Sequence, residues 1–428
     1  MVDSIKTVTG RSKLAAPLLA ACPGETIAAA LSNMADSLER HADEIFAANQ
    51  EDITRSQEER ISTPLLKRLK FNEAKLAGVT EGLRQLAGME NPLGKVLLTR
   101  ELDSGLILQQ VSCPIGVISM IFESRPDALV QIAGLCAKSG NAVILKGGRE
   151  AMESNRILSR LLHDAGQEAG LPEGWLVLVE TREQVQALLE CHNDIDLIIP
   201  RGSNEFVQYI MKNTTIPVLG HADGICHVYI DKDADPEMAV AVTVDSKTQY
   251  LAVCNAAETL LIHYEAAPRI LPLLHEALSS SGVEIRGCVR TREIITALPA
   301  TEEDWATEYL DAVLSIRVVD SLDNAIEHIN TYGSGHTDAI VSSNEAAAQL
   351  FMRAVDTANA VWNASTRFAD GFRYGLGAEV GISTGKIHAR GPVGIEGLMI
   401  YQWQLRGNGH IVAPYAAGTK RFTHRDIS

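Results

Sequence analysis

The feature that most constrains the fold is the alternation of short apolar runs with longer amphipathic stretches in the first half of the chain. The apolar runs lie at residues 116–121, 142–145, 175–179, 196–199 and 216–219. The stretches at residues 127–138, 150–169, 183–190 and 204–211 have helical spacing. Continuous apolar strands that alternate with helices indicate a doubly wound α/β fold, with a parallel sheet covered on both faces. Such sheets bind nucleotides at the carboxyl ends of their strands.

Helical stretches also precede the first of these strands. Apolar residues recur at helical spacing over residues 24–49 and again over residues 64–86. Short apolar runs then lie on either side of Gly105, which predicts a β-hairpin or crossing arm at about residues 96–112.

A second strand and helix series follows between residues 225 and 362, and the density of Pro and Gly between residues 371 and 397 indicates loops. We therefore predict three segments, at residues 1–222, 223–390 and 391–428. The last is expected to form an exposed strand or arm.

Composition excludes several classes of function. The formal net charge of −16 argues against nucleic acid and against an anionic membrane surface as partners, because both require clustered cations. No apolar run is long enough to span a bilayer, and the first residues lack the apolar segment of a signal peptide. We expect a cytoplasmic protein that does not contact a membrane.

The cysteines and histidines do not follow metal or disulfide patterns. Seven cysteines are scattered without C-x-x-C spacing, and twelve histidines form no H-E-x-x-H pattern. We predict neither a disulfide framework nor a metal site.

One thiol lies where a nucleophile would be useful. Cys254 occupies a polar stretch just before the apolar run at residues 260–263. If this stretch were a loop-to-helix junction, free backbone N–H groups would favour the thiolate, which attacks carbonyl carbon. The same pattern also suits a small buried structural cysteine, so spacing alone leaves both interpretations open.

Several loops at strand ends suit an anion. Lys146, Gly147, Gly148 and Arg149 follow a strand, so the glycines permit close backbone approach and the cations can meet a phosphate. Ser203 precedes a predicted helix and suits the same role. Ordinary βα turns explain both loops equally well, and no G-x-G-x-x-G fingerprint is present.

Three further segments carry guanidinium and hydroxyl groups that can bind a phosphate or carboxylate. They supply Ser124 with Arg125, Ser365 with Arg367, and Arg390. A surface salt bridge is the alternative for Arg125.

Taken together, these segments resemble the γ-glutamyl phosphate reductase family, a branch of the aldehyde dehydrogenase superfamily. The resemblance runs from about residue 31 to residue 409. Its most specific pieces are PIGVI at 114–118, ESRP at 123–126, KSGNAVILKGG at 138–148, GHADGICH at 220–227, CNA with ETLL at 254–261, and NASTRF at 363–368. The resemblance implies an aldehyde dehydrogenase-like fold with two doubly wound α/β domains and a small β oligomerisation arm. It also implies that residues 1–222 bind NADPH and that residues 223–390 carry the nucleophile.

The implied reaction is the NADPH-dependent reduction of L-glutamate 5-phosphate to L-glutamate 5-semialdehyde with release of phosphate, the second step of proline biosynthesis. Cys254 then forms a thioester with the glutamyl group. The resemblance assigns site residues as follows: Asn255 and Ser124 beside Cys254 as oxyanion donors; Arg125, Ser365, Arg367 and Arg390 for substrate or phosphate; and Lys146, Gly147, Gly148, Ser203 and Glu308 for the cofactor.

Departures from related patterns refine this expectation. Hydrolytic aldehyde dehydrogenases carry a glutamate base in the segment similar to residues 218–224, whereas this chain has none there, so water activation is expected to be disabled. His221 is an alternative proton donor. Residues 250–252 read Tyr-Leu-Ala where the family usually has Arg-Pro-Gly, so the wall beside the thiol differs.

Two rival functions remain open at the sequence level. The chain can be an acylating aldehyde dehydrogenase that uses coenzyme A, or a folded scaffold without turnover. The sequence contains no kinase domain, so a separate glutamate kinase is the expected partner for handover of the labile phosphate. The hairpin and the C-terminal tail resemble dimer-forming arms, which predicts a homo-oligomer.

Overall fold

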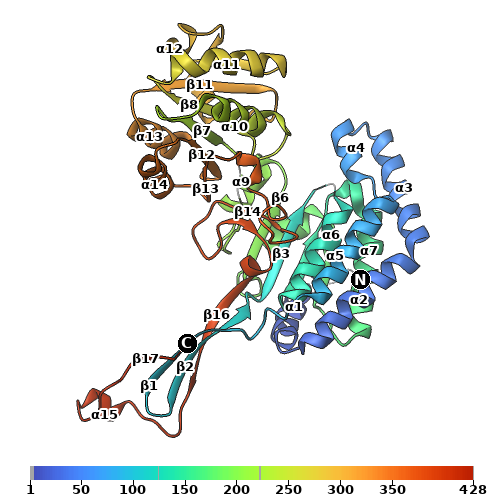
Figure 1. Ribbon diagram of the computed structural model, residues 1–428. Helices are drawn as coiled ribbons and strands as arrows, with labels where there is room; N and C mark the ends of the chain where they lie inside the picture. Colours follow the sequence, from blue (N-terminus) through green and yellow to red (C-terminus); the bar gives the residue numbers. More distant parts are fainter. Residues whose placement is uncertain (1–3, 124, 221–222, 428) are drawn as a thin grey trace. The chain divides into compact units, whose positions relative to one another are not determined.

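The computed structural model describes residues 4–123, 125–220 and 223–427 (Figure 1). The chain forms two compact units. Unit 1 comprises residues 1–202, 208–218 and 394–428, and unit 2 comprises residues 203–207 and 219–393. The boundaries fall at residues 218/219 and 393/394, close to the predicted 222/223 and 390/391. The tail after residue 393 groups with unit 1.

The core of unit 1 is a four-stranded parallel sheet in the order β5-β4-β3-β6. The strands are β3 (Val117–Phe122), β4 (Ala142–Lys146), β5 (Leu176–Leu178) and β6 (Leu197–Arg201). The apolar run at residues 216–219 forms only an isolated bridge between Val218 and Ile198. Pro217 has no N–H to donate to a ladder, which explains the missing strand.

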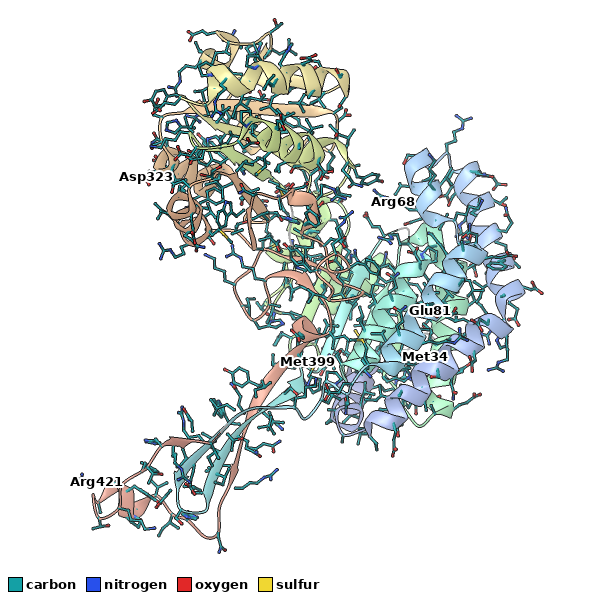
Figure 2. The ribbon with its side chains drawn as sticks, in the orientation of Figure 1. Met34, Arg68, Glu81, Asp323, Met399 and Arg421 are labelled. Atoms are coloured by element: carbon teal, nitrogen blue, oxygen red, sulfur yellow. The ribbon has the colours of Figure 1, made fainter. Side chains whose placement is uncertain are left out.

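Helices cover both faces of this sheet. They are α1 (Ile5–Ala20), α2 (Gly24–Arg40), α3 (Ala42–Glu58), α4 (Thr63–Leu69), α5 (Glu73–Gly88), α6 (Pro126–Lys138), α7 (Met152–Glu168), α8 (Arg182–Leu188) and α9 (Asn204–Lys212). α6 and α7 connect strands in one direction across the sheet, and α8 connects them in the other, so right-handed crossovers place α8 on the opposite face. Met34 of α2 is fully buried in the helical layer (Figure 2).

Two helical predictions were too coarse. The stretch at residues 24–49 is divided at His41 into α2 and α3, and the stretch at residues 64–86 is divided before α5. Asn72 caps α5 by accepting a hydrogen bond from the N–H of Lys75, and this cap starts a new helix there.

An antiparallel arm extends from unit 1. It consists of β1 (Val96–Asp103), β2 (Leu106–Pro114), β16 (Met399–Arg406) and β17 (Arg425–Asp426), in the order β16-β2-β1-β17, with the short helix α15 (Ala413–Ala416). The hairpin predicted at residues 96–112 is therefore present, and the C-terminal tail pairs with it. Arg421 lies toward the end of the arm away from Met399 (Figure 2).

Unit 2 contains a seven-stranded parallel sheet in the order β10-β9-β11-β8-β7-β12-β13. The strands are β7 (Cys226–Ile230), β8 (Ala257–His263), β9 (Glu284–Gly287), β10 (Leu298–Pro299), β11 (Val313–Val319), β12 (Thr337–Val341) and β13 (Asn359–Trp362). A small ribbon pairs β14 (Gly381–Ser383) with β15 (Gly391–Val393) in the region predicted as loops.

The helices of unit 2 also lie on both faces of its sheet. They are α10 (Pro236–Thr248), α11 (Ala267–Ser280), α12 (Val289–Arg292), α13 (Leu322–Tyr332) and α14 (Glu345–Ala354). α10 and α11 contribute to one apolar core, and α13 and α14 contribute to a second. The predicted class, two doubly wound α/β domains with a small β arm, is confirmed.

No single helix among the described residues combines the length and apolar character needed to cross a membrane. α1 and α2 meet that test only as a pair, and the pair bends by 120° at its break.

Candidate active site

Cys254 lies in the turn that joins α10 to β8, and its side chain is half-buried. The predicted position just before the apolar run is correct, because that run is the fully buried strand β8. The expectation of a helix amino terminus is wrong, because a helix precedes the thiol and a strand follows it. Stabilisation of a thiolate must therefore come from neighbouring side chains and turn N–H groups rather than from a helix dipole.

Gly224 lies directly against the nucleophile turn. A Cβ added at Gly224 would lie 2.2 Å from the carbonyl oxygen and 2.5 Å from the Cα of Cys254. Both contacts are with backbone, which cannot rotate away as a side chain can. The absence of a side chain at Gly224 therefore sets the position of Cys254.

We expect Gly224→Ala to lower kcat about a hundredfold, because a displacement of about 1 Å at a reacting group has this effect. The matched control is Gly381→Ala, since a Cβ at Gly381 meets nothing within 4 Å. Steady-state kinetics of both variants, with circular dichroism to verify folding, make the comparison. An active Gly224→Ala enzyme would show that the turn tolerates the shift.

A second turn packs on the carboxyl side of the nucleophile. The hydroxyl of Thr366 donates to the carbonyl of Asn255 over 2.7 Å, and the amide of Asn255 donates to the carbonyl of Ala369 over 2.9 Å. Asn255 is buried, and its Oδ1 has no hydrogen-bond partner among the described residues. Its side chain therefore anchors the Cys254 turn to residues 366–369.

Ser365 and Arg367 belong to this second turn. The hydroxyl of Ser365 accepts from the N–H of Arg367, so it caps the short 3-10 helix at Thr366–Phe368. Arg367 is only 8% exposed, and its Nε donates to Oε1 of Gln249 over 3.0 Å.

Arg367 is a buried cation beside the thiol. Within the described part of the chain it forms no ion pair with a carboxylate. Burial lowers the pKa of Arg367, and Arg373 lowers it further, whereas negative charge on Cys254 raises it. The coupling is reciprocal, so Arg367 favours the thiolate of Cys254 and supplies a positive charge for an anionic substrate.

The other side chains that were predicted to bind an anion have different surroundings. Arg390 already pairs with Asp356, at 2.8 Å. Arg125, in unit 1, pairs with Asp127 at 3.0 Å, and Lys75 pairs with the same carboxylate. Ser124 lies outside the described residues. Of the predicted set, the structure brings Cys254, Asn255, Ser365 and Arg367 together.

Unit 1 contains a small hollow at the carboxyl ends of β4 and β5. Gly147 and Gly148 line it, together with Asn155. A Cβ at Gly147 would lie 2.1 Å from Nδ2 of Asn155, so a larger residue would have to displace the Asn155 side chain, and the buried Oδ1 of Asn155 has no hydrogen-bond partner among the described residues. Open glycine backbone with an unused acceptor suits the sugar hydroxyls of a nucleotide.

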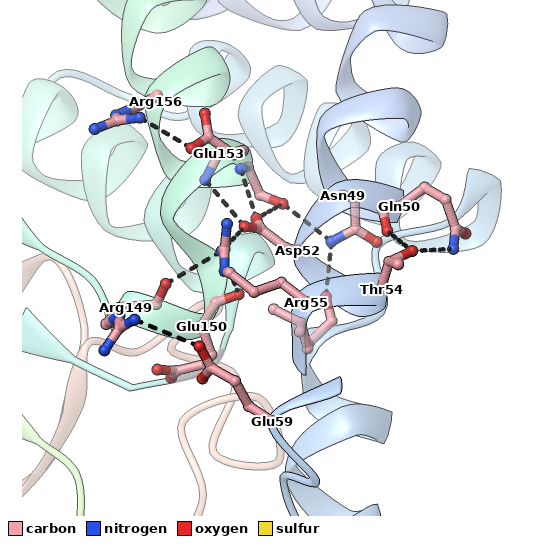
Figure 3. Close-up of polar contacts among 12 residues, drawn as sticks. Asn49, Gln50, Asp52, Thr54, Arg55, Glu59, Arg149, Glu150, Glu153 and Arg156 are labelled. Atoms are coloured by element: carbon pink, nitrogen blue, oxygen red, sulfur yellow. Dashed lines mark hydrogen bonds and ion pairs between the residues drawn. The ribbon is translucent and has the colours of Figure 1, made fainter. Parts of the chain in front are cut away.

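A polar network holds this loop (Figure 3). The buried Asp52 of α3 accepts from the N–H groups of Glu153 and Ser154, at 3.1 and 2.8 Å, and pairs with Arg55. Arg55 in turn donates to the carbonyl of Arg149 over 3.3 Å. The guanidinium of Arg149 is 80% exposed and lies 3.4 Å from Glu59. The sequence analysis did not identify Asp52. Its spacing of seven residues from the buried Ile45 places both side chains on the same face of α3, and a carboxylate on a buried helix face is the signal that could have revealed it.

Ser203 and Glu308 are linked through Asn204. Ser203 immediately precedes α9, and the next residue, Asn204, donates from Nδ2 to Glu308 over 2.9 Å and to Asp223 over 2.6 Å. Both predicted cofactor residues therefore lie close to the amino terminus of α9, where backbone N–H groups suit a phosphate.

An ion pair that the sequence reasoning missed lies next to the nucleophile turn. Lys247 of α10 and Glu258 of β8 are both fully buried, and Nζ lies 2.5 Å from Oε2. Burial raises the pKa of Glu258 to about 7, although Lys247 opposes this. The pair connects the two elements that flank Cys254.

Comparison with known proteins agrees with these features. The aldehyde dehydrogenase family model matches residues 3–286. The chain is 58% identical to gamma-glutamyl phosphate reductase from Acetivibrio thermocellus, over 99% of both chains. It is 59% identical to the enzyme of that name from Pelotomaculum thermopropionicum, over 98% of this chain and 96% of the relative.

A solved structure shows the same similarity. The crystal structure of gamma-glutamyl phosphate reductase from Thermotoga maritima superposes with a TM-score of 0.93 at 37% identity, and covers 96% of this chain and 100% of that one. The resemblance inferred from the sequence motifs is confirmed. The chain therefore belongs to the aldehyde dehydrogenase family, within its gamma-glutamyl phosphate reductase branch.

Proposed function

We propose that this protein catalyses the NADPH-dependent reduction of L-glutamate 5-phosphate to L-glutamate 5-semialdehyde with release of phosphate, the second step of proline biosynthesis. The observation that carries the proposal is the buried Arg367 beside the Cys254 turn, in a chain of this family. It supplies a nucleophile together with a charge that suits an acyl phosphate.

The first chemical step belongs to Cys254. Its thiolate attacks the carbonyl carbon of the acyl phosphate, the bond from that carbon to the phosphate oxygen breaks, and a thioester remains. Arg367 stabilises the thiolate before attack and the negative charge of the substrate during it. Turn N–H groups near Cys254, with Ser124 and Asn255, are the proposed donors to the oxyanion.

A bound nicotinamide cofactor supplies the hydride that reduces the thioester. The residues proposed to hold the cofactor are Lys146, Gly147, Gly148, Ser203 and Glu308. Gly147 and Gly148 line the hollow in unit 1 and Lys146 directly precedes them, whereas Ser203 precedes α9 and Glu308 accepts from Asn204 at its start. Release of the aldehyde returns the Cys254 sulfur to the thiolate. The segment at residues 219–222 has no carboxylate to activate water, which protects the thioester from hydrolysis.

Arg149 is proposed to favour NADPH over NADH. We expect Arg149→Gln to weaken NADPH binding about tenfold, because a charge-assisted contact with the 2′-phosphate is lost. Fluorescence titration with each nucleotide measures the effect, and NADH binding should stay unchanged. Arg156→Gln is the matched control, since Arg156 is already paired with Glu180 and Glu153. An equal loss for NADH would contradict the assignment.

The arm is proposed to assemble a homo-oligomer. Large apolar side chains on β16 are exposed, including Trp403 at 54% and Leu405 at 57%. We expect the double variant Trp403→Glu, Leu405→Glu to dissociate the assembly, as measured by analytical ultracentrifugation. An unchanged sedimentation coefficient would place the interface elsewhere. We further propose a cytoplasmic enzyme that receives its substrate from a separate glutamate kinase.

The reverse reaction tests the proposed function. Purified protein is mixed with glutamate 5-semialdehyde and NADP, and NADPH formation is followed with and without inorganic phosphate. Strict dependence on phosphate supports the proposal. Formation of NADPH with coenzyme A in place of phosphate would instead identify an acylating dehydrogenase, and no turnover under either condition would support a scaffold.

A further inference from the structure

A second cavity lies in unit 2, away from the nucleophile. Its volume is about 600 Å³, and it is formed by the loop after β9, the end of β11 and one side of α13. Ligand pockets in proteins commonly measure about 300 to 1,000 Å³, so this cavity is large enough for a small metabolite.

The cavity lies at a topological switch point of the sheet. β9 and β11 are parallel neighbours, but β9 leads through α12 to β10 on one side, and β11 leads through α13 to β12 on the other. Open α/β sheets bind ligands at the carboxyl ends of strands whose connections diverge in this way. Cys254 precedes β8, so it lies at the opposite, amino edge of the same sheet.

Arg317, in the cavity wall, forms no ion pair with an acidic residue in the part of the chain that the structure describes. Nη1 of Arg317 lies 3.1 Å from Nδ1 of His328, and its guanidinium lies 5.5 Å from the ring centroid of Trp305. Among the residues that the structure describes, no carboxylate forms an ion pair with Arg317. Its charge is therefore available to a ligand.

His328 does not contribute a second charge. Arginine can only donate, so Nδ1 of His328 accepts and the ring is neutral with its hydrogen on Nε2. Burial, together with the neighbouring His227 and Arg317, lowers the pKa of His328 to about 3. This Nε2 is buried without a hydrogen-bond partner in the described part of the chain.

Of the other charged side chains that the structure describes in the cavity wall, the carboxylate of Glu327 is the one without an ion pair. Arg290 is neutralised by Asp320, at 2.5 Å, and also donates to the carbonyl of Val318. Glu327 of α13 lines the cavity, is exposed, and makes no ion pair within the described ranges. The wall therefore presents one unpaired guanidinium and one unpaired carboxylate.

We infer that this cavity binds a small zwitterionic α-amino acid, with its carboxylate on Arg317 and its ammonium group on Glu327. Val318 and Val319 line the same cavity and offer apolar surface to a short side chain. A phosphate or another simple anion would meet the carboxylate of Glu327 without compensation, so the charge pattern favours a ligand that carries both signs.

Isothermal titration calorimetry of the full-length protein tests this site. The probes are glycine, L-alanine and L-proline, with acetate and pyrrolidine as ligands that carry only one of the two charges. We expect at least one amino acid to bind with a stoichiometry of one per chain, and acetate and pyrrolidine to bind at least about tenfold more weakly. Absence of binding by all three amino acids, or acetate binding as tightly as they do, would overturn the inference.

Variants assign any binding to the cavity. Glu327→Gln should weaken the amino acid about tenfold, and so should Arg317→Met. Arg317→Met removes the contact with Trp305 and can disturb folding. Glu327 is exposed, so Glu327→Gln is expected to fold and keeps the test decisive. The matched control is Glu276→Gln on α11, another exposed glutamate, which lies outside the cavity. If Glu327→Gln binds the amino acid as tightly as the wild-type protein does, this site is excluded.

Discussion

Replacing Cys254 with alanine is expected to lower phosphate-dependent NADPH formation by about a thousandfold or more, the scale seen when a covalent nucleophile is removed. The reason is that no thioester can form, so neither phosphate release nor aldehyde reduction can proceed by the proposed route. Initial rates with semialdehyde, phosphate and NADP measure the loss. Mass spectrometry of the wild-type enzyme after reaction with L-glutamate 5-phosphate should place the glutamyl adduct on Cys254.

The appropriate control is another thiol of the same unit. Burial raises the pKa of Cys288, but hydrogen bonds from Thr291 and from the N–H groups of Val318 and Arg290 outweigh this and lower it overall. Cys288 is therefore the rival for nucleophilic reactivity. Cys288→Ser should retain activity, because Cys288 follows β9, at the edge of the sheet opposite Cys254. If Cys288→Ser were inactive and Cys254→Ala active, the assignment of the nucleophile would be wrong.

Lys247→Met is expected to destabilise the protein by about 3 to 5 kcal/mol, because it leaves the buried carboxylate of Glu258 without its partner. Urea unfolding followed by circular dichroism measures the change. Glu258→Gln keeps an acceptor for the N–H of Leu310, which lies 3.3 Å from Oε1. The double variant should lose less stability than the sum of the two single variants, since a neutral pair needs no compensation. Additive losses would show that the ion pair is not coupled.

The effect of Lys247→Met should depend on pH. Burial already raises the pKa of Glu258 to about 7, above its ordinary value of 4.5, and loss of Lys247 raises it further. A carboxyl group with a raised folded-state pKa contributes stability below its unfolded pKa, and this contribution is lost as pH rises through the folded pKa. Below about pH 7 the carboxyl group is protonated in both folded proteins, so the deficit of the variant should grow only above that pH, between about pH 7 and pH 9. A deficit that is equal at both pH values would contradict this origin.

The candidate site was predictable in residue type and only partly in geometry. The sequence motifs predict Cys254 and Arg367 as site residues, and in the folded chain negative charge on Cys254 raises the pKa of Arg367. Ser365 is predicted to bind phosphate, and its hydroxyl oxygen also accepts from the N–H of Arg367, so it fixes the turn that carries Arg367. Arg390 is predicted to bind substrate or phosphate, and in the structure it forms an ion pair with Asp356 of the same chain.

The fold class followed from the sequence because the periodicity of apolar residues records which faces are buried, and burial is a local property of each strand or helix. The fully buried β8 and the hairpin around Gly105 were recognisable for this reason. The motif around Cys254 likewise predicted that the nucleophile is a cysteine.

Only the tertiary structure decided which separate segments meet. Two contacts join residues far apart in the chain. Gly224 packs against the backbone of Cys254, and the hydroxyl of Thr366 donates to the carbonyl of Asn255. The turn at Cys254 was mistaken for a helix start because its conformation depends on these contacts rather than on local spacing. Packing of helices across a sheet sets such pairings, and no local periodicity records them.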